Sequence, residues 1–488
     1  MSRVPDLSDL DLQLEDVEDY TSEYPTGEAD IRNSAENDVV KYRRGVVTAF
    51  IFENKKLVMI AGTALVVLIA IISIASGKGS APAAVDDGHA PLILTDAAIL
   101  DDPKTDDIKN ELQKMYNNND MDPIVLTGAD GDNTPQRRAL SWLSHDYEED
   151  MDHATRMTRY ALAVFYYSTN DVPTEETPEP KTWYEADKWL TKEHACEWQG
   201  IECNERLHVV EIDLSRNNLS GKIPKEITAL DEHLTTLILS ENFILMHEKD
   251  YDALMPLTNL ETLLMDDNFL HGSNGLPTQF GSLVSMKKLK LSYNLFKGNM
   301  DSAHSNAVLA NMNQLTHLEM EACYLTGSMP HHIGRMSNLV YLYMRRNAMK
   351  FDLKFLTTGQ MTDLFALWID ANEITGTIPS EIGLLESMAS LSMTNSSLTG
   401  TIPSEMGNMS ALRRLWLFNN ELTGSVPVEL KKLSDLEILQ VHHNKLKGEM
   451  PNGVCENIHN SGSDVKSLTS DCGTNQISCS DSCCTRCF

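Results

Sequence analysis

The cysteines are the residues of this sequence whose number and spacing most clearly point to a chemical role. Six of the nine cysteines fall close together near the C-terminus. Thiols at such spacing form disulfides in an oxidising compartment or bind zinc as thiolates. Six cysteines allow fifteen pairings, and the sequence does not choose among them. Because no histidine neighbours the C-x3-C-C-x2-C tail, we expect disulfides and not zinc at Cys455, Cys472, Cys479, Cys483, Cys484 and Cys487.

Two histidine pairs and one acidic run are the other candidates for metal chemistry. Adjacent residues on a strand point to opposite faces, so the pairs at 331–332 and 442–443 are predicted to be solvated surface groups. The run Asp130-Gly-Asp132 lacks the remaining ligands of a calcium loop. The sequence carries no hydrolase, zinc-protease, phosphate-loop or protein-kinase motif. It therefore predicts a protein that is not an enzyme and that holds no metal or cofactor.

One apolar stretch, from Leu57 to Ala75, contains no charged residue. At ~1.5 Å per residue it would span roughly 28 Å, about one hydrocarbon core. The sequence therefore predicts a transmembrane helix over residues 57–76, with a buried core helix as the alternative. Basic residues gather before this stretch, which predicts a cytosolic N-terminus and an extracellular or lumenal C-terminal part, and we expect the plasma membrane. These residues are Lys41, Arg43, Arg44, Lys55 and Lys56, against Lys78 alone closely after it.

Cysteines and glycosylation sequons support the same orientation. All nine cysteines lie beyond the apolar stretch, on the side where an oxidising compartment would let disulfides persist. Three N-x-S sequons on that side predict glycosylation at Asn218, Asn395 and Asn408.

The segments on either side of the predicted helix are acidic. Residues 1–40 hold 12 acidic and 2 basic residues. We therefore expect residues 1–56 to form a disordered cytosolic tail that ends in a basic juxtamembrane segment. A docking site for a cytosolic adaptor is the functional alternative to a merely solvated tail. Residues 77–134 are expected to form an acidic stalk. The formal net charge of -31 argues against a nucleic-acid partner.

Residues 207–451 are repetitive. Apolar residues recur there in the frame L-x-x-L-x-L-x-x-N, mostly at steps of 24 to 26 residues. Each copy predicts a short parallel strand whose leucines point into a shared core, followed by an asparagine that can bond the backbone of neighbouring coils. Because no single copy buries its apolar face alone, stacking must supply the core. The ten copies end at Asn217, Asn242, Asn268, Asn294, Cys323, Asn347, Asn372, Ser396, Asn420 and Asn444.

The open ends of such a stack need covers, because they would otherwise expose the core. Two helical patterns and a cysteine-bracketed turn within residues 135–206 predict a helical N-terminal cap. The cysteine-rich segment 452–488 is the expected C-terminal cap.

Most copies continue with a second frame, N-x-L-[ST]-G-x-I-P, as in EITGTIPSEIG and SLTGTIPSEMG. This frame closely resembles the plant-type leucine-rich repeats of receptor-like proteins and polygalacturonase-inhibiting proteins. The block from Trp183 to Cys203 is similar to the N-terminal cap of that family. The resemblance covers roughly residues 137–488 and implies an α/β repeat fold, a right-handed solenoid whose role is extracellular recognition. It also implies a cap disulfide between Cys196 and Cys203.

The sequence departs from that family in three places. Membrane-anchored members usually carry their helix after the repeats, whereas here the predicted helix comes first, as in membrane-anchored algal relatives. The sixth copy, NAMKFDLKFLTTGQM, lacks the G-x-I-P turn, so we expect an irregular outward loop there. Cys323 replaces an asparagine and is expected to be a buried free thiol.

Variable positions within L-x-L-x-x point away from the core and line the concave face of the solenoid. Large aromatics and arginine gather on this face in copies six to ten, and exposed tryptophan and tyrosine often anchor interfaces. We therefore predict a binding face for an extracellular peptide, glycan or protein. The alternative is that these rings pack across strands and only stabilise the sheet. The predicted face consists of Tyr343, Arg345, Arg346, Trp368, Asp370, Trp416, Phe418, His442 and His443.

Taken together, these patterns predict a membrane-anchored, receptor-like, non-catalytic recognition protein. Two other functions fit the same sequence. One is a structural or adhesive surface protein that uses the solenoid as a spacer. The other is an inhibitor of an extracellular enzyme such as a polysaccharide hydrolase.

Overall fold

The computed structural model describes most of the chain beyond residue 180 and shorter pieces before it. The predicted transmembrane helix over residues 57–76, the acidic tail and most of the stalk lie outside the described residues. Within the described ranges, no helix is long and apolar enough to cross a membrane. These ranges are 108, 110–114, 134–145, 151–170, 172–174, 181–461, 466–472, 476–479 and 483–488.

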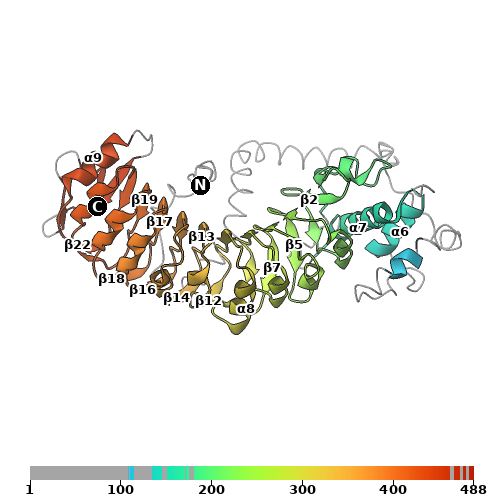
Figure 1. The fold of residues 1–488 in the computed structure, drawn as a ribbon, viewed down its shortest axis with the longest axis horizontal. Coiled ribbons are helices and arrows are strands. Elements are labelled where there is room, and N and C mark those ends of the chain that lie inside the picture. Colours follow the sequence, from blue (N-terminus) through green and yellow to red (C-terminus); the bar gives the residue numbers. More distant parts are fainter. Residues whose placement is uncertain are drawn as a thin grey trace, which may run out of the picture. The chain divides into compact units, whose positions relative to one another are not determined.

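The repeats stack through one sheet of 13 strands (Figure 1). All pairs in this sheet are parallel except β1 with β2, which are antiparallel. The strands are in register, so that Leu263 lies opposite Leu237 and Leu289 in the neighbouring coils. Their order is β1 (Ile201–Cys203), β2 (Val209–Asp213), β4 (Thr236–Ile238), β6 (Thr262–Leu264), β8 (Lys288–Lys290), β11 (His317–Glu319), β13 (Tyr341–Tyr343), β15 (Ala366–Trp368), β17 (Ser390–Ser392), β19 (Arg414–Trp416), β21 (Ile438–Gln440), β24 (Ser467–Ser470) and β26 (Arg486–Cys487).

Shorter parallel sheets follow the asparagine turn in each coil, where the second frame of the repeat predicts a turn. One contains β3 (Ser220–Gly221), β5 (Phe243–Met246), β7 (Phe269–Gly272) and β9 (Leu295–Phe296). The next contains β10 (Gly298–Asn299), β12 (Leu325–Gly327), β14 (Ala348–Asp352), β16 (Glu373–Thr377) and β18 (Ser397–Thr399). Two pairs complete them, β20 (Thr423–Gly424) with β22 (Lys445–Leu446), and β23 (Gly448–Glu449) with β25 (Ile477–Ser478).

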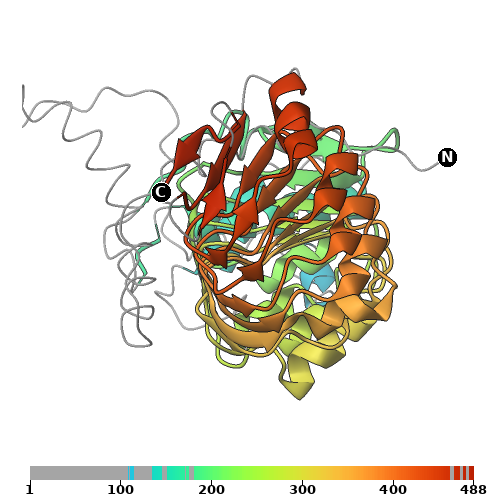
Figure 2. The same cartoon turned by 90° about the vertical axis from the view of Figure 1, so that its left-hand side faces the viewer.

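Short helices close each coil, and along the stack they occupy a different wall from the strands (Figure 2). Proline precedes most of these 3-10 helices, because its fixed φ suits a helix start and its missing N–H is not needed there. They are η3 (Lys225–Leu230), η4 (Asp250–Ala253), η5 (Thr278–Ser282), η6 (Ile333–Arg335), η7 (Leu353–Thr358), η8 (Ser380–Leu384), η9 (Ser404–Asn408) and η10 (Val428–Lys432). The long fourth-to-fifth step instead holds an α-helix, α8 (Ala303–Asn311).

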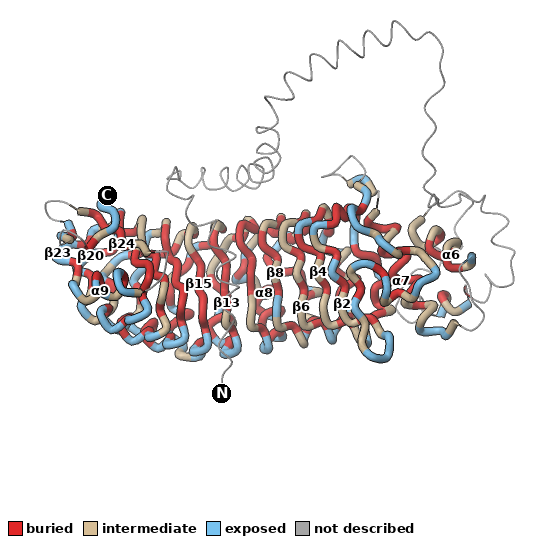
Figure 3. The backbone as a smooth tube through the Cα atoms, turned by 90° about the horizontal axis from the view of Figure 1, so that it is seen from above, coloured by how far each residue is buried: buried red, intermediate tan, exposed pale blue. Residues whose placement is uncertain are grey.

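The core runs through the middle of every coil (Figure 3). Inward leucines and methionines of the strands are fully buried, and the ladder asparagines join neighbouring coils. Asn294 shows the pattern: its Nδ2 donates to the carbonyls of Met265 at 2.8 Å and Leu291 at 3.0 Å, and its Oδ1 accepts from the backbone N–H of Leu270 at 2.9 Å. One amide thus satisfies buried backbone groups of two neighbouring coils, which explains why asparagine recurs at this position.

Two copies keep this geometry with a different side chain. The Sγ of Cys323 lies 3.2 Å from the carbonyl of Leu291, and this cysteine is buried and forms no disulfide. The hydroxyl of Ser396 donates to the carbonyl of Asn372 at 3.2 Å. A single donor therefore suffices to hold the carbonyl of the preceding coil.

The expectation of an irregular outward loop in the sixth copy is wrong. Its segment forms β14, which pairs with β16, and the 3-10 helix η7. The Asp352 carboxylate accepts from the backbone N–H of Lys354 at 3.1 Å and begins η7, which replaces the turn that proline begins elsewhere. Apolar residues of this segment enter the core, namely Met349, Phe351, Leu353, Phe355, Leu356 and Met361.

At the N-terminal end, α6 (Pro135–His145) and α7 (His153–Thr169) precede a layer of tryptophans that covers the first coil. The guanidinium carbon of the buried Arg159 lies 5.1 Å from the ring centre of Trp142 and 5.3 Å from that of Trp198. A disulfide joins Cys196, in η2 (Ala195–Glu197), to Cys203, in β1. The tryptophan layer and this disulfide together close the stack at its first strand.

At the C-terminal end, the cap continues the sheet instead of merely covering it. After α9 (Asn452–Asn460), strands β24 and β26 add to β21. Asp471 takes the place of a ladder asparagine, since its two carboxylate oxygens accept from the backbone N–H groups of His443 at 2.7 Å and Asn444 at 2.8 Å. The cap is therefore built as further coils of the solenoid.

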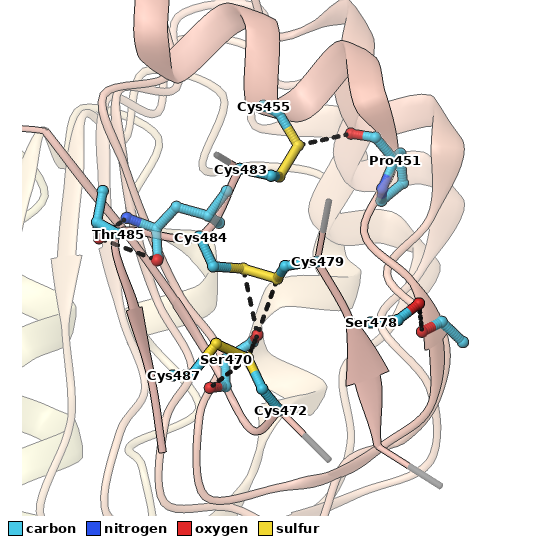
Figure 4. The surroundings of a disulfide bond; sticks show 12 residues. Pro451, Cys455, Ser470, Cys472, Ser478, Cys479, Cys483, Cys484, Thr485 and Cys487 are labelled. Carbon is cyan, nitrogen blue, oxygen red and sulfur yellow. Dashed lines mark hydrogen bonds between the residues drawn. A yellow bond between two sulfur atoms is a disulfide. The ribbon is translucent and has the colours of Figure 1, made fainter. Parts of the chain in front are cut away.

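Three disulfides cross this cap (Figure 4). The structure confirms that the chain forms disulfide bonds and selects one of the fifteen pairings that the sequence left open. The sulfurs of Cys472, Cys479 and Cys484 lie within 4.8 Å of one another. Each is oxidised to a disulfide, so none is free as a thiolate for zinc. The pairs are Cys455–Cys483, Cys472–Cys487 and Cys479–Cys484.

Candidate ligand-binding face

The predicted concave face is one surface of the 13-stranded sheet. In β13 the neighbours Leu342 and Met344 are fully buried in the core, which places Tyr343 and Arg345 on the opposite surface. Strand register then puts Tyr343 beside Trp368 in the next coil. The structure thus brings together residues that lie far apart in the sequence.

The rings of copies six to nine contact one another across strands. Tyr343 stacks on Trp368 with ring centres 4.7 Å apart, and Trp368 meets Trp416 edge-to-face at 6.3 Å although one strand separates them. The indole N–H of Trp368 donates to the Ser390 hydroxyl at 2.8 Å. These contacts match the alternative left open by the sequence, in which the rings pack across strands.

The exposure expected for these rings is wrong. Trp368 is 2% exposed and Trp416 is 3% exposed. Rings that contact neighbours across strands lose surface to each other, which a single strand considered alone does not reveal. Burial also raises the pKa of the Tyr343 phenol, with the carboxylates of Glu319 and Glu321 adding to the rise.

A buried ion pair adjoins the rings. Arg345 Nε donates to Glu321 Oε2 at 2.8 Å, and the Arg345 guanidinium carbon lies 4.8 Å from the ring centre of Trp368. Burial raises the pKa of Glu321 to about 7, although the charge of Arg345 acts in the opposite direction. Arg346 and Asp370 lie beside this pair, since the backbone N–H of Arg346 donates to the carbonyl of Asp370 at 3.0 Å.

Phe418, His442 and His443 form a second group beside the C-terminal cap, in which His442 is buried, Phe418 is half-buried and His443 is exposed. The imidazole of His442 stacks between the ring of Phe418 at 4.7 Å and that of Phe488 at 4.1 Å, and its Nδ1 lies 2.6 Å from the Thr469 hydroxyl. The prediction of a solvated surface histidine is wrong for His442, which is only 5% exposed. Burial lowers its pKa to about 4, with His443 contributing to the decrease.

The sequence alone did not predict that Phe488 contacts the concave face at His442. It follows Cys487, whose disulfide to Cys472 fixes the end of β26. The cysteine spacing predicted a cap but not its register against β21, so nothing in the sequence linked this ring to His442.

The three glycosylation sequons differ in accessibility, and glycosylation itself stays a prediction. Asn218 is 8% exposed, and its Nδ2 donates to the carbonyl of Thr182 at 2.7 Å. Asn395 is half-buried, and its Oδ1 accepts from Asn419 Nδ2 at 2.6 Å. Asn408 is exposed at the end of η9. Only Asn408 of the three offers an exposed amide.

Known proteins share these repeats. The family model described as Leucine Rich Repeat matches residues 208–230 and 411–433. Receptor-like protein 35 of Arabidopsis thaliana is 29% identical over 197 residues, which cover 40% of this chain and 19% of that protein. Receptor-like protein kinase 7 of the same plant is 31% identical over 103 residues, which cover 21% of this chain and 8% of that protein.

One solved structure is similar in fold as well as in sequence. It is the leucine-rich-repeat ectodomain of the plant membrane receptor kinase GASSHO1/SCHENGEN3 from Arabidopsis thaliana in complex with CASPARIAN STRIP INTEGRITY FACTOR 2. Its TM-score is 0.51 at 30% identity, over 61% of this chain and 34% of that chain. This chain thus spans less than a fifth of the curated relatives and about a third of the solved ectodomain.

The in-register sheet, the asparagine ladder and the layered concave face define a leucine-rich-repeat solenoid. Within that class, the chain is similar to plant-type receptor-like leucine-rich-repeat proteins, both in the second frame of its repeats and in its matches to the Arabidopsis proteins.

Proposed function

We propose that this chain is a membrane-anchored, non-catalytic recognition protein that binds an extracellular peptide on its concave face. The observation that carries the proposal is the layer formed by Tyr343, Trp368 and Trp416, with Arg345 packed against it. Aromatic and arginine side chains dominate the binding energy of protein interfaces, and here they form the concave surface of the sheet while packing against one another. The similarity to an ectodomain solved in complex with CASPARIAN STRIP INTEGRITY FACTOR 2 supports a ligand on the repeats.

The anchor in this proposal is the predicted helix over residues 57–76. Basic residues before it support a cytosolic N-terminus, and the disulfides beyond it support an oxidising compartment for the repeats. The acidic tail would then face the cytosol, where an adaptor could bind it. Protease protection on intact cells tests this arrangement, since repeats that are cleaved only after detergent is added would contradict a plasma-membrane orientation.

A peptide-display selection on the full-length chain tests the binding face. We expect the double variant Trp368→Ala/Trp416→Ala to lose at least tenfold in affinity for the selected peptides, because truncation removes two packed rings. The matched control is Tyr184→Ala, which removes an aromatic ring that is 75% exposed on the N-terminal cap. A thermal melt of each variant shows that it is folded.

Equal capture of the selected peptides by the double variant and the wild-type chain would contradict the proposed face. A selection that enriches no peptide at all would contradict a peptide ligand.

A further inference from the structure

Among the residues that the structure describes, one carboxylate oxygen on the concave face has no hydrogen-bond partner. Glu321 is 5% exposed, and among the described side chains its Oε1 is buried without a hydrogen bond. Its other oxygen, Oε2, accepts from Arg345 Nε at 2.8 Å. The backbone of Glu321 is satisfied, since its N–H donates to the Ser292 hydroxyl at 3.0 Å and its carbonyl accepts from the N–H of Tyr293 at 2.8 Å. The unmet acceptor is therefore confined to Oε1.

An unpaired buried acceptor is costly. Leaving one unsatisfied costs about 1–3 kcal/mol, and more for a charged group. A carboxylate offers about four lone-pair sites, of which Arg345 uses one through Nε. Native proteins rarely leave such an oxygen empty without a functional reason.

Two further carboxylates lie near Glu321. Glu319 is buried beside it on the same strand face and is paired with Lys290 at 3.0 Å. Asp370 adds a third carboxylate in the field of Glu321. Lys290 and Arg345 are the cations paired with the first two of these carboxylates. Burial raises the pKa of Glu321 to about 7, with Glu319 and Asp370 adding to the rise.

Two buried aromatic rings lie on the same surface of the sheet as Glu321. Tyr343 is in register with Glu319, and its ring stacks on Trp368. Ring faces attract cations and cover the methylene stem of a lysine or arginine side chain.

We infer that Glu321 Oε1 accepts a hydrogen bond from a basic side chain, lysine or arginine, of the peptide that binds the concave face. This inference rests on the proposed function and names the chemistry of its ligand. Oε2 holds Arg345 in place, and Oε1 receives the ligand cation.

The test uses random peptides displayed against the full-length chain. We expect the selected peptides to be enriched in lysine or arginine. One selected peptide should then bind Glu321→Gln at least tenfold more weakly than the wild-type chain, because the new amide puts a donor where the acceptor was. The matched control is Glu437→Gln, which neutralises another buried carboxylate on the sheet, one that lies 3.7 Å from Arg413.

A peptide variant tests the same contact without changing the protein. Replacing the basic residue of the selected peptide by norleucine should weaken binding to the wild-type chain at least tenfold and cause no further loss with Glu321→Gln, because both changes remove one interaction. Additive losses, equal binding by Glu321→Gln and Glu437→Gln, or no basic enrichment would overturn the inference. Selected peptides that bind the double variant Trp368→Ala/Trp416→Ala as well as the wild-type chain would instead refute the proposed function.

Discussion

The ring of Phe488 lies 4.1 Å from the imidazole of His442, and the two planes are 14° from parallel. This stack joins the C-terminal cap to the concave face, because His442 also stacks on Phe418. Since β26 places Phe488, the cap decides how much of the predicted binding face meets solvent at its C-terminal end.

Removing Phe488 should raise the pKa of His442. Burial holds this pKa at about 4, below its ordinary value of 6.5. We expect Phe488→Ala to move it back toward 6.5, because the ring that excludes water is gone, and to cost about 1 kcal/mol of stacking energy. An NMR titration of the histidine ring protons measures the shift, with Phe488→Tyr as the control that keeps a stacked ring. An unchanged pKa in Phe488→Ala would show that other groups bury His442.

The same histidine should make the solenoid sensitive to acid. A folded pKa of about 4 against an unfolded value of 6.5 means that, between these values, the unfolded chain binds a proton that the folded chain does not. Stability from this group is therefore complete above pH 6.5 and falls as the pH drops toward 4. Urea unfolding across this window should show the fall, and His442→Gln should flatten it. Parallel pH profiles of the two chains would contradict this role.

The buried asparagines of the ladder should contribute more to the free energy of unfolding than exposed asparagines do. Asn294→Ala removes the side-chain partner of the buried N–H of Leu270 and the shorter of two bonds to the carbonyl of Met265, and we expect a loss of about 3 kcal/mol. Asn259→Ala is the control, since Asn259 is exposed and bonds only the carbonyls of Asp231 and Glu232 at 3.3 Å. Urea unfolding measures both variants, and similar losses would argue against a special role for the ladder.

Cys323 should not react with alkylating reagents in the folded chain. It is fully buried, and burial raises the pKa of its thiol to about 12, so almost no thiolate is present near neutral pH. Mass spectrometry after iodoacetamide treatment should find Cys323 labelled only when the chain has been unfolded without a reductant. Labelling of the native chain at a rate typical of free cysteine would refute the buried position.

Asn408 is the sequon that we expect to carry a glycan when the chain passes through the secretory pathway. Its amide is exposed, whereas the amide of Asn218 is buried and donates to Thr182. Glycosidase treatment followed by peptide mapping should find modification at Asn408 and none at Asn218. An Asn408→Gln variant that keeps the full glycan mass would place the modification elsewhere.

The sequence by itself determined the repeat. The spacing of leucines and asparagines dictates parallel coils in register, because only stacking buries the apolar face of each copy and an amide can both donate to and accept from the backbone of the preceding coil. It also named the residues that gather on the concave face, such as Tyr343 and Trp368, because alternation along a strand separates core positions from surface positions.

Only the tertiary structure decided which of these residues contact one another and how deeply they are buried. The sixth copy keeps the fold without its G-x-I-P turn, since apolar side chains such as Phe351 and Phe355 fill the core in its place. The pairing of the C-terminal cysteines, the stack of Phe488 on His442 and the unmet oxygen of Glu321 likewise depend on contacts between different coils. The repeat period in the sequence fixes which positions of neighbouring coils lie side by side. The burial of each side chain and its hydrogen-bond and ring contacts are set only when the coils pack together.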